Sequence, residues 1–218
     1  VASNTMTFDE YKKATLFRWV IMFAHYLGTM QYIARFTRKT KDIPYKEFYE
    51  RLVSFIEREK GSFLNKELEI TRKNIDGVLA VEQPWGRIVP EVKENFAWDF
   101  EEATAIRIAK NQDEFYAEVK KFLIDEIGYE DDNLLQNLLA YQIDAIIDPT
   151  IQYPLDKSYD YNIHRVIHKD KPLLMGEYNL SFDAQNYNGD YYEWGKEVLW
   201  WGRRVGACKT KIEEMQTV

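Results

Sequence analysis

Helical periodicity is the feature that most constrains the fold of this chain. Apolar residues recur three and four positions apart through most of the first 147 residues, and Gly or Pro interrupts the pattern at intervals. Helices of this kind must bury their apolar faces against one another. Hydrophobic residues make up 45% of the 218 residues, enough for a sizeable core. We therefore expect a mainly α fold, organised as a single helical domain over residues 1–218.

The first predicted helix runs from about Thr7 to Phe36. Apolar residues also lie outside its main stripe, so most of its circumference is apolar. A helix of this type is usually buried on most sides, and one side would suit contact with another domain. The stripe comprises Leu16, Trp19, Val20, Phe23, Leu27, Met30 and Ala34.

Further helices follow at intervals set by helix boundary residues. Pro44 suits a first helical turn, and Gly61 is a plausible C-terminal stop. Asp99 and Glu102 have the spacing of a capping box. The segment 82–99 has no helical pattern and is expected to be a loop. The predicted helices cover about 44–60, 62–80, 99–110, 112–127, 132–147 and 190–204, the last one resuming through 212.

A small antiparallel β ribbon is predicted near residues 158–182. The segments 158–167 and 173–182 have the composition of strands. His164 and His168 would then lie at a strand end, about 13 Å apart along the strand. No cysteine and no obvious third ligand lies nearby in the sequence, so we expect no metal site here.

Charge and cysteine content exclude several classes of protein. The formal net charge of −7 argues against broad nucleic-acid binding, which usually needs a basic surface. The lone Cys208 excludes an internal disulfide and any iron–sulfur cluster held by four cysteines of this chain. We interpret Cys208 as structural, and a single thiol fits a reducing, cytoplasmic location.

The sequence shows no membrane or secretion signal. Its most apolar stretch, from Leu16 to Leu27, is too short to span a bilayer and contains Arg18 and His25. No signal peptide is evident. The chain begins at Val1 instead of Met, which favours the interpretation that it is a fragment of a larger protein.

Two clusters of aromatic and cationic side chains are candidate contacts for a ligand or a further domain. His25, Gln31 and Arg35 lie on the first predicted helix. His25 is either a hydrogen-bonded structural residue or a group able to act as acid or base near neutral pH. The other candidates are Trp85, Arg87, Trp200, Trp201, Arg203 and Arg204.

The tryptophan and arginine clusters have two interpretations. Arginine stacked on tryptophan can serve the fold alone. It can also form an aromatic, cationic wall that holds an anionic ligand or a partner surface. The sequence contains no glycine-rich phosphate loop, no Gly-x-Ser-x-Gly and no His-Glu-x-x-His, so it predicts no catalytic residue.

Several short motifs occur in a suggestive order: Trp19, His25, Gly28, Gln31-Tyr32 and Arg35; then Trp85-Gly86-Arg87 and Val89-Pro90-Glu91; then Val198-Leu199-Trp200-Trp201-Gly202-Arg203. This order resembles the C-terminal region of cobalamin-binding-type radical S-adenosylmethionine proteins. That family includes iron–sulfur oxidoreductases and proteins similar to anaerobic magnesium-protoporphyrin monomethyl ester cyclase. The resemblance covers most of the chain.

The resemblance implies a non-catalytic accessory domain that caps a catalytic barrel or shapes substrate access to it. The four-iron cluster, S-adenosylmethionine and any cobalamin would belong to N-terminal domains outside this chain, which would be its partners. Two alternatives remain open. One is a free-standing helical module that binds an anionic or aromatic small ligand. The other is a small complete enzyme that uses His25 or the pair His164 and His168.

Overall fold

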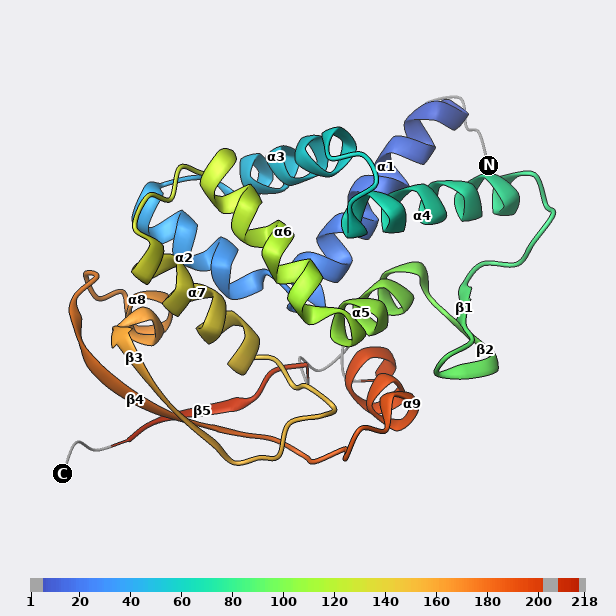
Figure 1. Ribbon diagram of the computed structural model, residues 1–218. Coiled ribbons are helices and arrows are strands. Elements are labelled where there is room, and N and C mark those ends of the chain that lie inside the picture. Colours follow the sequence, from blue (N-terminus) through green and yellow to red (C-terminus); the bar gives the residue numbers. More distant parts are fainter. Residues whose placement is uncertain (1–5, 202–207, 216–218) are drawn as a thin grey trace.

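A computed structural model describes residues 6–201 and 208–215, which form a mainly α-helical fold (Figure 1). The helices are α1 (Phe8–Ile21), α2 (Gln31–Lys41), α3 (Tyr45–Arg58), α4 (Phe63–Leu79), α5 (Phe100–Lys110), α6 (Gln112–Asp125), α7 (Asp132–Asp144), α8 (Ile163–Lys169) and α9 (Tyr191–Trp194). The π-helical segments η1 (Met22–Tyr26) and η2 (Gly195–Trp201) directly follow α1 and α9. The strands are β1 (Arg87–Val89), β2 (Lys93–Trp98), β3 (Leu155–Tyr161), β4 (Met175–Asp183) and β5 (Lys211–Glu214).

Two small antiparallel sheets lie at separate places on the edge of the helical part. Figure 1 shows the sheet β3-β4-β5 beside α7 and α8, and the ribbon β1-β2 beside α5. In the larger sheet, Tyr159 of β3 pairs with Tyr178 of β4, and Phe182 of β4 pairs with Ile212 of β5. The predicted mainly α class with a small antiparallel β element near residues 158–182 is confirmed.

The core is rich in aromatic side chains. Phe122 of α6 receives Phe48 and Phe55 of α3 edge-on, with ring centroids 5.3 and 5.5 Å apart. Tyr141 of α7 continues the core toward the sheet, where its ring lies 6.2 Å from that of Phe182. Edge-to-face contacts stabilise a core beyond the area that they bury. One hydrophobic cluster therefore runs from the helices to the sheet.

The prediction of one continuous helix from Thr7 to Phe36 is wrong. α1 and η1 end at Tyr26, and α2 starts at Gln31. Gly28 between them has φ +92°, and a Cβ there would lie 2.6 Å from Cδ1 of Ile146. Only glycine combines that backbone conformation with so close a neighbour. The apolar periodicity continues across the break because both helices bury their faces in the same core.

Gln142 holds the break between the two helices in place. The buried Gln142 side chain accepts hydrogen bonds from the backbone N–H groups of Tyr32 and Ile33, at 2.9 and 3.3 Å, and donates to the carbonyl of Gly28 at 2.8 Å. The first N–H groups of a helix have no partner within the helix. A single amide from α7 therefore caps α2.

The segment from Ile163 to Lys169 is helical, so the prediction of a strand through residue 167 is wrong beyond Tyr161. Ile163, Val166 and Ile167 are buried, and their spacing of three and four is that of a helix. Asn162 closes the turn that follows, because its side chain donates to the carbonyl of Pro172 and accepts from the N–H of Leu174. Residues with strand composition thus form α8.

Two further strands differ from the predictions. Residues 211–214 form β5 where the last helix was expected to resume, and the expected loop 82–99 contains the ribbon β1-β2. Residues 211–214 form a strand because they pair with β4, and β1 and β2 form strands because they pair with each other. The predicted helix starts near Pro44 and at the capping box of Asp99 and Glu102 are confirmed. Within residues 6–201 and 208–215, no helix is long and apolar enough to cross a membrane.

Candidate ligand-binding site

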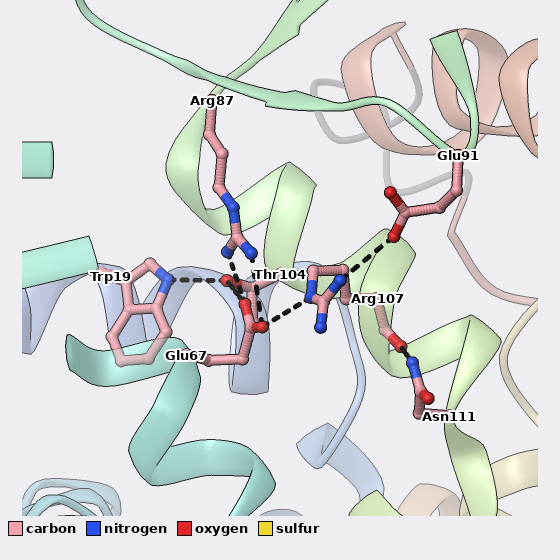
Figure 2. A network of polar contacts seen from close by, with 7 residues as sticks. All are labelled: Trp19, Glu67, Arg87, Glu91, Thr104, Arg107 and Asn111. Atoms are coloured by element: carbon pink, nitrogen blue, oxygen red, sulfur yellow. Dashed lines mark hydrogen bonds and ion pairs between the residues drawn. The ribbon is translucent and has the colours of Figure 1, made fainter. Parts of the chain in front are cut away.

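Arg87, a candidate ligand contact, lies in an internal network of polar side chains (Figure 2). Its Nη1 lies 2.6 Å from Oε2 of Glu67, and Nε of Arg107 lies 2.6 Å from Oε1 of the same carboxylate. Thr104 donates to Glu67 at 3.3 Å and accepts from the indole N–H of Trp19 at 3.1 Å. We call this set the Glu67 network: Trp19, Glu67, Arg87, Glu91, Thr104, Arg107 and Asn111.

The Glu67 network is balanced in charge and serves the fold. Glu67 is fully buried, and a buried carboxylate is tolerated only with ionic and hydrogen-bonding partners. Glu91 adds a second carboxylate, 3.1 Å from Arg107. Two carboxylates therefore face two guanidinium groups. Arg87 of β1 and Glu91 after it tie the ribbon to Glu67 of α4 and Arg107 of α5.

The described tryptophan candidates lie on the ribbon or next to it. Trp85 packs on Phe100, with ring centroids 4.6 Å apart, and the half-buried Trp200 packs on Phe96 at 5.3 Å. Arg203 and Arg204 lie outside the described residues, as does the side chain of Trp201. The described members of this group thus make contacts within the protein.

His25 lies in η1 and is held by two tyrosines of α3. Its Nδ1 is 2.8 Å from the hydroxyl oxygen of Tyr49, and its ring centroid lies 5.1 Å from that of Tyr45. π-helical turns are rare in proteins as a whole. Those that do occur are frequently found at functional sites. The half-buried His25 is therefore both fixed in orientation and accessible at one edge.

His164 and His168 lie on one face of α8, since residues four apart are neighbours on a helix. Their rings stack with centroids 4.6 Å apart and an interplanar angle of 27°. Nδ1 of His164 is 3.0 Å from the hydroxyl oxygen of Tyr141, and the ring of Tyr32 covers His168 at 5.7 Å. The expectation that the two histidines are far apart is wrong, because it assumed a strand.

Arg35 and Lys209 approach the histidines from two other segments. Nη2 of Arg35, on α2, donates to the carbonyl of Ile167 at the end of α8, with the two atoms 3.4 Å apart. Lys209 pairs with Ile146 through the backbone, next to the end of α7. Both cations are half-buried. We call His25, Arg35, His164, His168 and Lys209 the cationic histidine site.

The two cations act on the histidines and on each other. Burial, followed by the charges of Lys209 and Arg35, lowers the pKa of His25. Burial, the neighbouring His164 and the same cations lower the pKa of His168 to about 4. Burial and then Arg35 lower the pKa of Lys209. The imidazoles are therefore neutral at pH 7, and the positive charges of Arg35 and Lys209 repel each other.

Within the described part of the chain, neither Arg35 nor Lys209 forms an ion pair with a carboxylate. The pKa of Asp170 is lowered mainly by its ion pair with Lys39 and only to a smaller extent by Arg35. Burial lowers the pKa of His164, and the charge of Glu214 partly opposes this. The Glu214 carboxylate is already bound by Arg165 and Lys169. Half-buried like charges without a counter-ion are costly, so this arrangement suits an anion.

Gln31 supplies a further polar group near the start of α2. It lies one turn before Arg35, and so on the same face of the helix. Its buried Oε1 has no hydrogen-bond partner among the residues that the structure describes. No three metal-ligating side chains come together within residues 6–201 and 208–215. The uncompensated cations disfavour a bound metal ion at this site and favour a negatively charged ligand.

Sequence reasoning found part of this site. It singled out His25 and Arg35 but missed Lys209, which joins them only because residues 208–210 pair with the end of α7. The helical spacing of Ile163, Val166 and Ile167 is the signal that could have placed His164 and His168 on one face.

No model of a known protein family matches the chain, and no curated protein sequence matches it either. The fold and the site define a mainly α-helical protein with two half-buried cations beside three histidines, of which His25 and His164 are half-buried and His168 is exposed.

Proposed function

We propose that this chain is a non-catalytic accessory domain that holds an anionic small ligand at the cationic histidine site. The observation that carries the proposal is that Arg35 and Lys209 come from distant segments, lie near the same histidines and have no carboxylate partner in the described part of the chain. Arg35 contacts the carbonyl of Ile167, the residue before His168, at 3.4 Å, and Lys209 pairs with Ile146 beside the end of α7. Their charges, after burial, help lower the pKa of the histidines. Guanidinium, ammonium and imidazole N–H groups are the donors that proteins use for carboxylate and phosphate groups.

The resemblance to the C-terminal region of cobalamin-binding-type radical S-adenosylmethionine proteins supports a more specific role. In such a protein this domain would cap the catalytic barrel or shape substrate access to it, in the cytoplasm. The four-iron cluster, S-adenosylmethionine and any cobalamin would be bound by other domains of the same polypeptide. The cationic histidine site would then hold an anionic group of the substrate while chemistry proceeds elsewhere.

A free-standing binding module is the second candidate, and the same site favours it. The two candidates agree about the ligand and differ about the parent protein. The length of the native product, measured by intact mass from the source cells, distinguishes them. A product several hundred residues longer, with a Cys-x-x-x-Cys-x-x-Cys motif upstream, supports the accessory domain. A native product of this length supports the free-standing module.

The experiment that tests ligand binding is calorimetric titration of the chain with inorganic phosphate and with citrate at pH 7.5 and low salt. We expect at least one anion to bind, and Arg35→Gln and Lys209→Gln to weaken it about tenfold or more, because each removes a charge-assisted hydrogen bond. Lys46→Gln is the matched control, since Lys46 is 81% exposed on α3. Binding that survives both substitutions unchanged would refute the proposed site.

The non-catalytic part of the proposal has its own test. We expect the purified chain, incubated with iron, sulfide and S-adenosylmethionine, to develop no cluster absorbance and to cleave no cofactor. A four-iron cluster on this chain would contradict the accessory-domain assignment.

A further inference from the structure

We propose that the ligand of the cationic histidine site carries a dianionic oxyanion of the phosphate-ester class, and that Tyr49 positions His25 to donate a hydrogen bond to it through Nε2. This inference rests on the proposed function and names the chemical class of its ligand. It assigns Tyr49 a role in recognition.

The charge of the site sets the charge of the ligand. Arg35 and Lys209 bring two positive charges. The carboxylates of Asp170 and Glu214, whose charges interact with Arg35 and with His164, are already paired with lysine and arginine side chains. A carboxylate ligand would leave one positive charge uncompensated. A phosphate monoester is close to dianionic above its second pKa of about 6, so it balances both cations.

Arg35 retains donors for this ligand. Its Nη2 is directed at the carbonyl of Ile167. A guanidinium has five N–H donors, and this is the one hydrogen bond of Arg35 within the described residues. The second N–H of Nη2, together with Nε or Nη1, therefore forms a fork for an oxyanion. The contact with Ile167 and the ring of Tyr32, whose centroid lies 5.9 Å from Cζ of Arg35, hold the fork in position. A fixed fork loses little freedom when it binds a phosphate oxygen pair.

Tyr49 determines which nitrogen of His25 carries the proton. Tyr49 is buried, and burial raises the pKa of its hydroxyl well above the usual value, so it stays protonated. When this O–H donates to Nδ1 across 2.8 Å, the proton of the neutral imidazole resides on Nε2. The second ring nitrogen of His25, Nε2, is then a donor and not an acceptor, as an anion requires.

The same arrangement occurs a second time at the site. The hydroxyl of Tyr141 lies 3.0 Å from Nδ1 of His164, and burial raises the pKa of that tyrosine well above the usual value as well. Two of the three histidines are thus paired through Nδ1 with a buried tyrosine. The pairing provides hydrogen-bond donors from neutral rings, which add no further repulsion to Arg35 and Lys209.

Two substitutions on α3 separate this role from a merely structural one. Tyr49→Phe removes the hydroxyl and keeps the ring, whereas Tyr45→Phe removes a hydroxyl from the other tyrosine that packs on His25. Both variants are titrated with inorganic phosphate, methyl phosphate and acetate at pH 7.5. We expect the two phosphates to bind more tightly than acetate. We also expect Tyr49→Phe to weaken phosphate about tenfold and Tyr45→Phe to change it less than twofold.

Long-range 1H–15N spectra of the histidine rings provide the second readout. We expect His25 to be the Nε2–H tautomer in the wild type and in Tyr45→Phe, and a mixture of tautomers in Tyr49→Phe. An Nδ1–H tautomer in the wild type, or unchanged phosphate affinity in Tyr49→Phe, would overturn the role of Tyr49.

The remaining outcomes separate this inference from the proposed function. Acetate that binds as tightly as methyl phosphate, with both weakened by Arg35→Gln, would overturn the phosphate class and leave the anion-binding function intact. If no anion binds, or if binding is insensitive to Arg35→Gln, the proposed function itself fails and this inference fails with it.

Discussion

Arginine side chains serve opposite purposes in the Glu67 network and in the cationic histidine site. In the Glu67 network, Arg87 and Arg107 bind one buried carboxylate, and Glu91 balances the remaining charge. In the cationic histidine site, Arg35 faces Lys209 and neutral histidines, and no carboxylate pairs with either cation in the described part of the chain. All three arginines are partly covered by the protein, so burial does not distinguish them. They differ in the charge of the groups around them.

This comparison indicates that the charges around a partly buried arginine distinguish a role in folding from a role in ligand binding. Where opposite charges are matched inside the molecule, removing one of them costs free energy of folding. Where like charges are held together, the fold tolerates a repulsion that an external anion can relieve. Substitutions in the two regions should therefore affect different measurements, and the predictions below test that separation.

The largest expected effect is on stability, from Glu67→Ala. This substitution leaves Arg87 and Arg107 without their buried partner, so we expect the free energy of unfolding to fall by roughly 3–5 kcal/mol. Urea denaturation measures it. The control is Glu69→Ala on the same helix, whose exposed carboxylate pairs with Arg72, and there we expect a loss of about 0.5 kcal/mol or less. Equal losses for the two variants would contradict the comparison.

The next largest effect is expected from Gln142→Ala, which removes the cap of α2. It leaves buried N–H groups of Tyr32 and Ile33 without a partner, so we expect a loss of about 2–3 kcal/mol in the free energy of unfolding. Gln136→Ala is the control, because Gln136 is an exposed residue of α7 whose amide contacts only Asp132 among the described residues. A loss below 1 kcal/mol for Gln142→Ala would show that water replaces the cap.

A smaller effect is expected on histidine protonation, from Arg35→Gln. Removal of this positive charge should raise the pKa of His25 and raise the pKa of His168 from about 4 toward the usual 6.5, as measured by NMR titration. The free energy of unfolding should change by less than about 1 kcal/mol, in contrast with Glu67→Ala. Lys46→Gln, which removes an exposed charge on α3, should leave both histidines unchanged.

The smallest effect concerns acid stability. His168 binds fewer protons in the folded state, where its pKa is about 4, than in the unfolded state, where it is near 6.5. Its contribution to folding is therefore complete above pH 6.5 and is lost as the pH falls toward 4. Because His168 is exposed and solvent screens its interactions, we expect the loss to be about 1 kcal/mol or less.

Urea denaturation of the wild type and of His168→Gln at pH 7 and pH 5 measures this contribution. The variant should lose less stability between the two values. Glu214, whose pKa is lowered to about 2 mainly by Arg165, acts in a separate window below pH 4.5 and does not contribute. A larger loss in the variant than in the wild type would reverse the sign of the argument.

The sequence by itself determined the mainly α class, several helix starts and much of the core. Pro44 and the pair Asp99 and Glu102 act through the backbone within a few residues, so their effects can be read locally. The burial of Phe48 and Leu52 follows from spacing along one helix. These features depend on short-range geometry, which a sequence states directly.

Tertiary structure alone decided where the charges and the breaks lie. The break between η1 and α2 is held by Gln142, and position 28 must be glycine because Ile146, far along the chain, leaves no room for a Cβ. Arg87 pairs with Glu67, while the charge of Arg35 acts on Lys209 and lowers its pKa after burial, and nothing within either local sequence distinguishes the two arginines. The contribution of a charged group to the free energy depends on its burial and on the sign of the charges near it in space. The fold sets both.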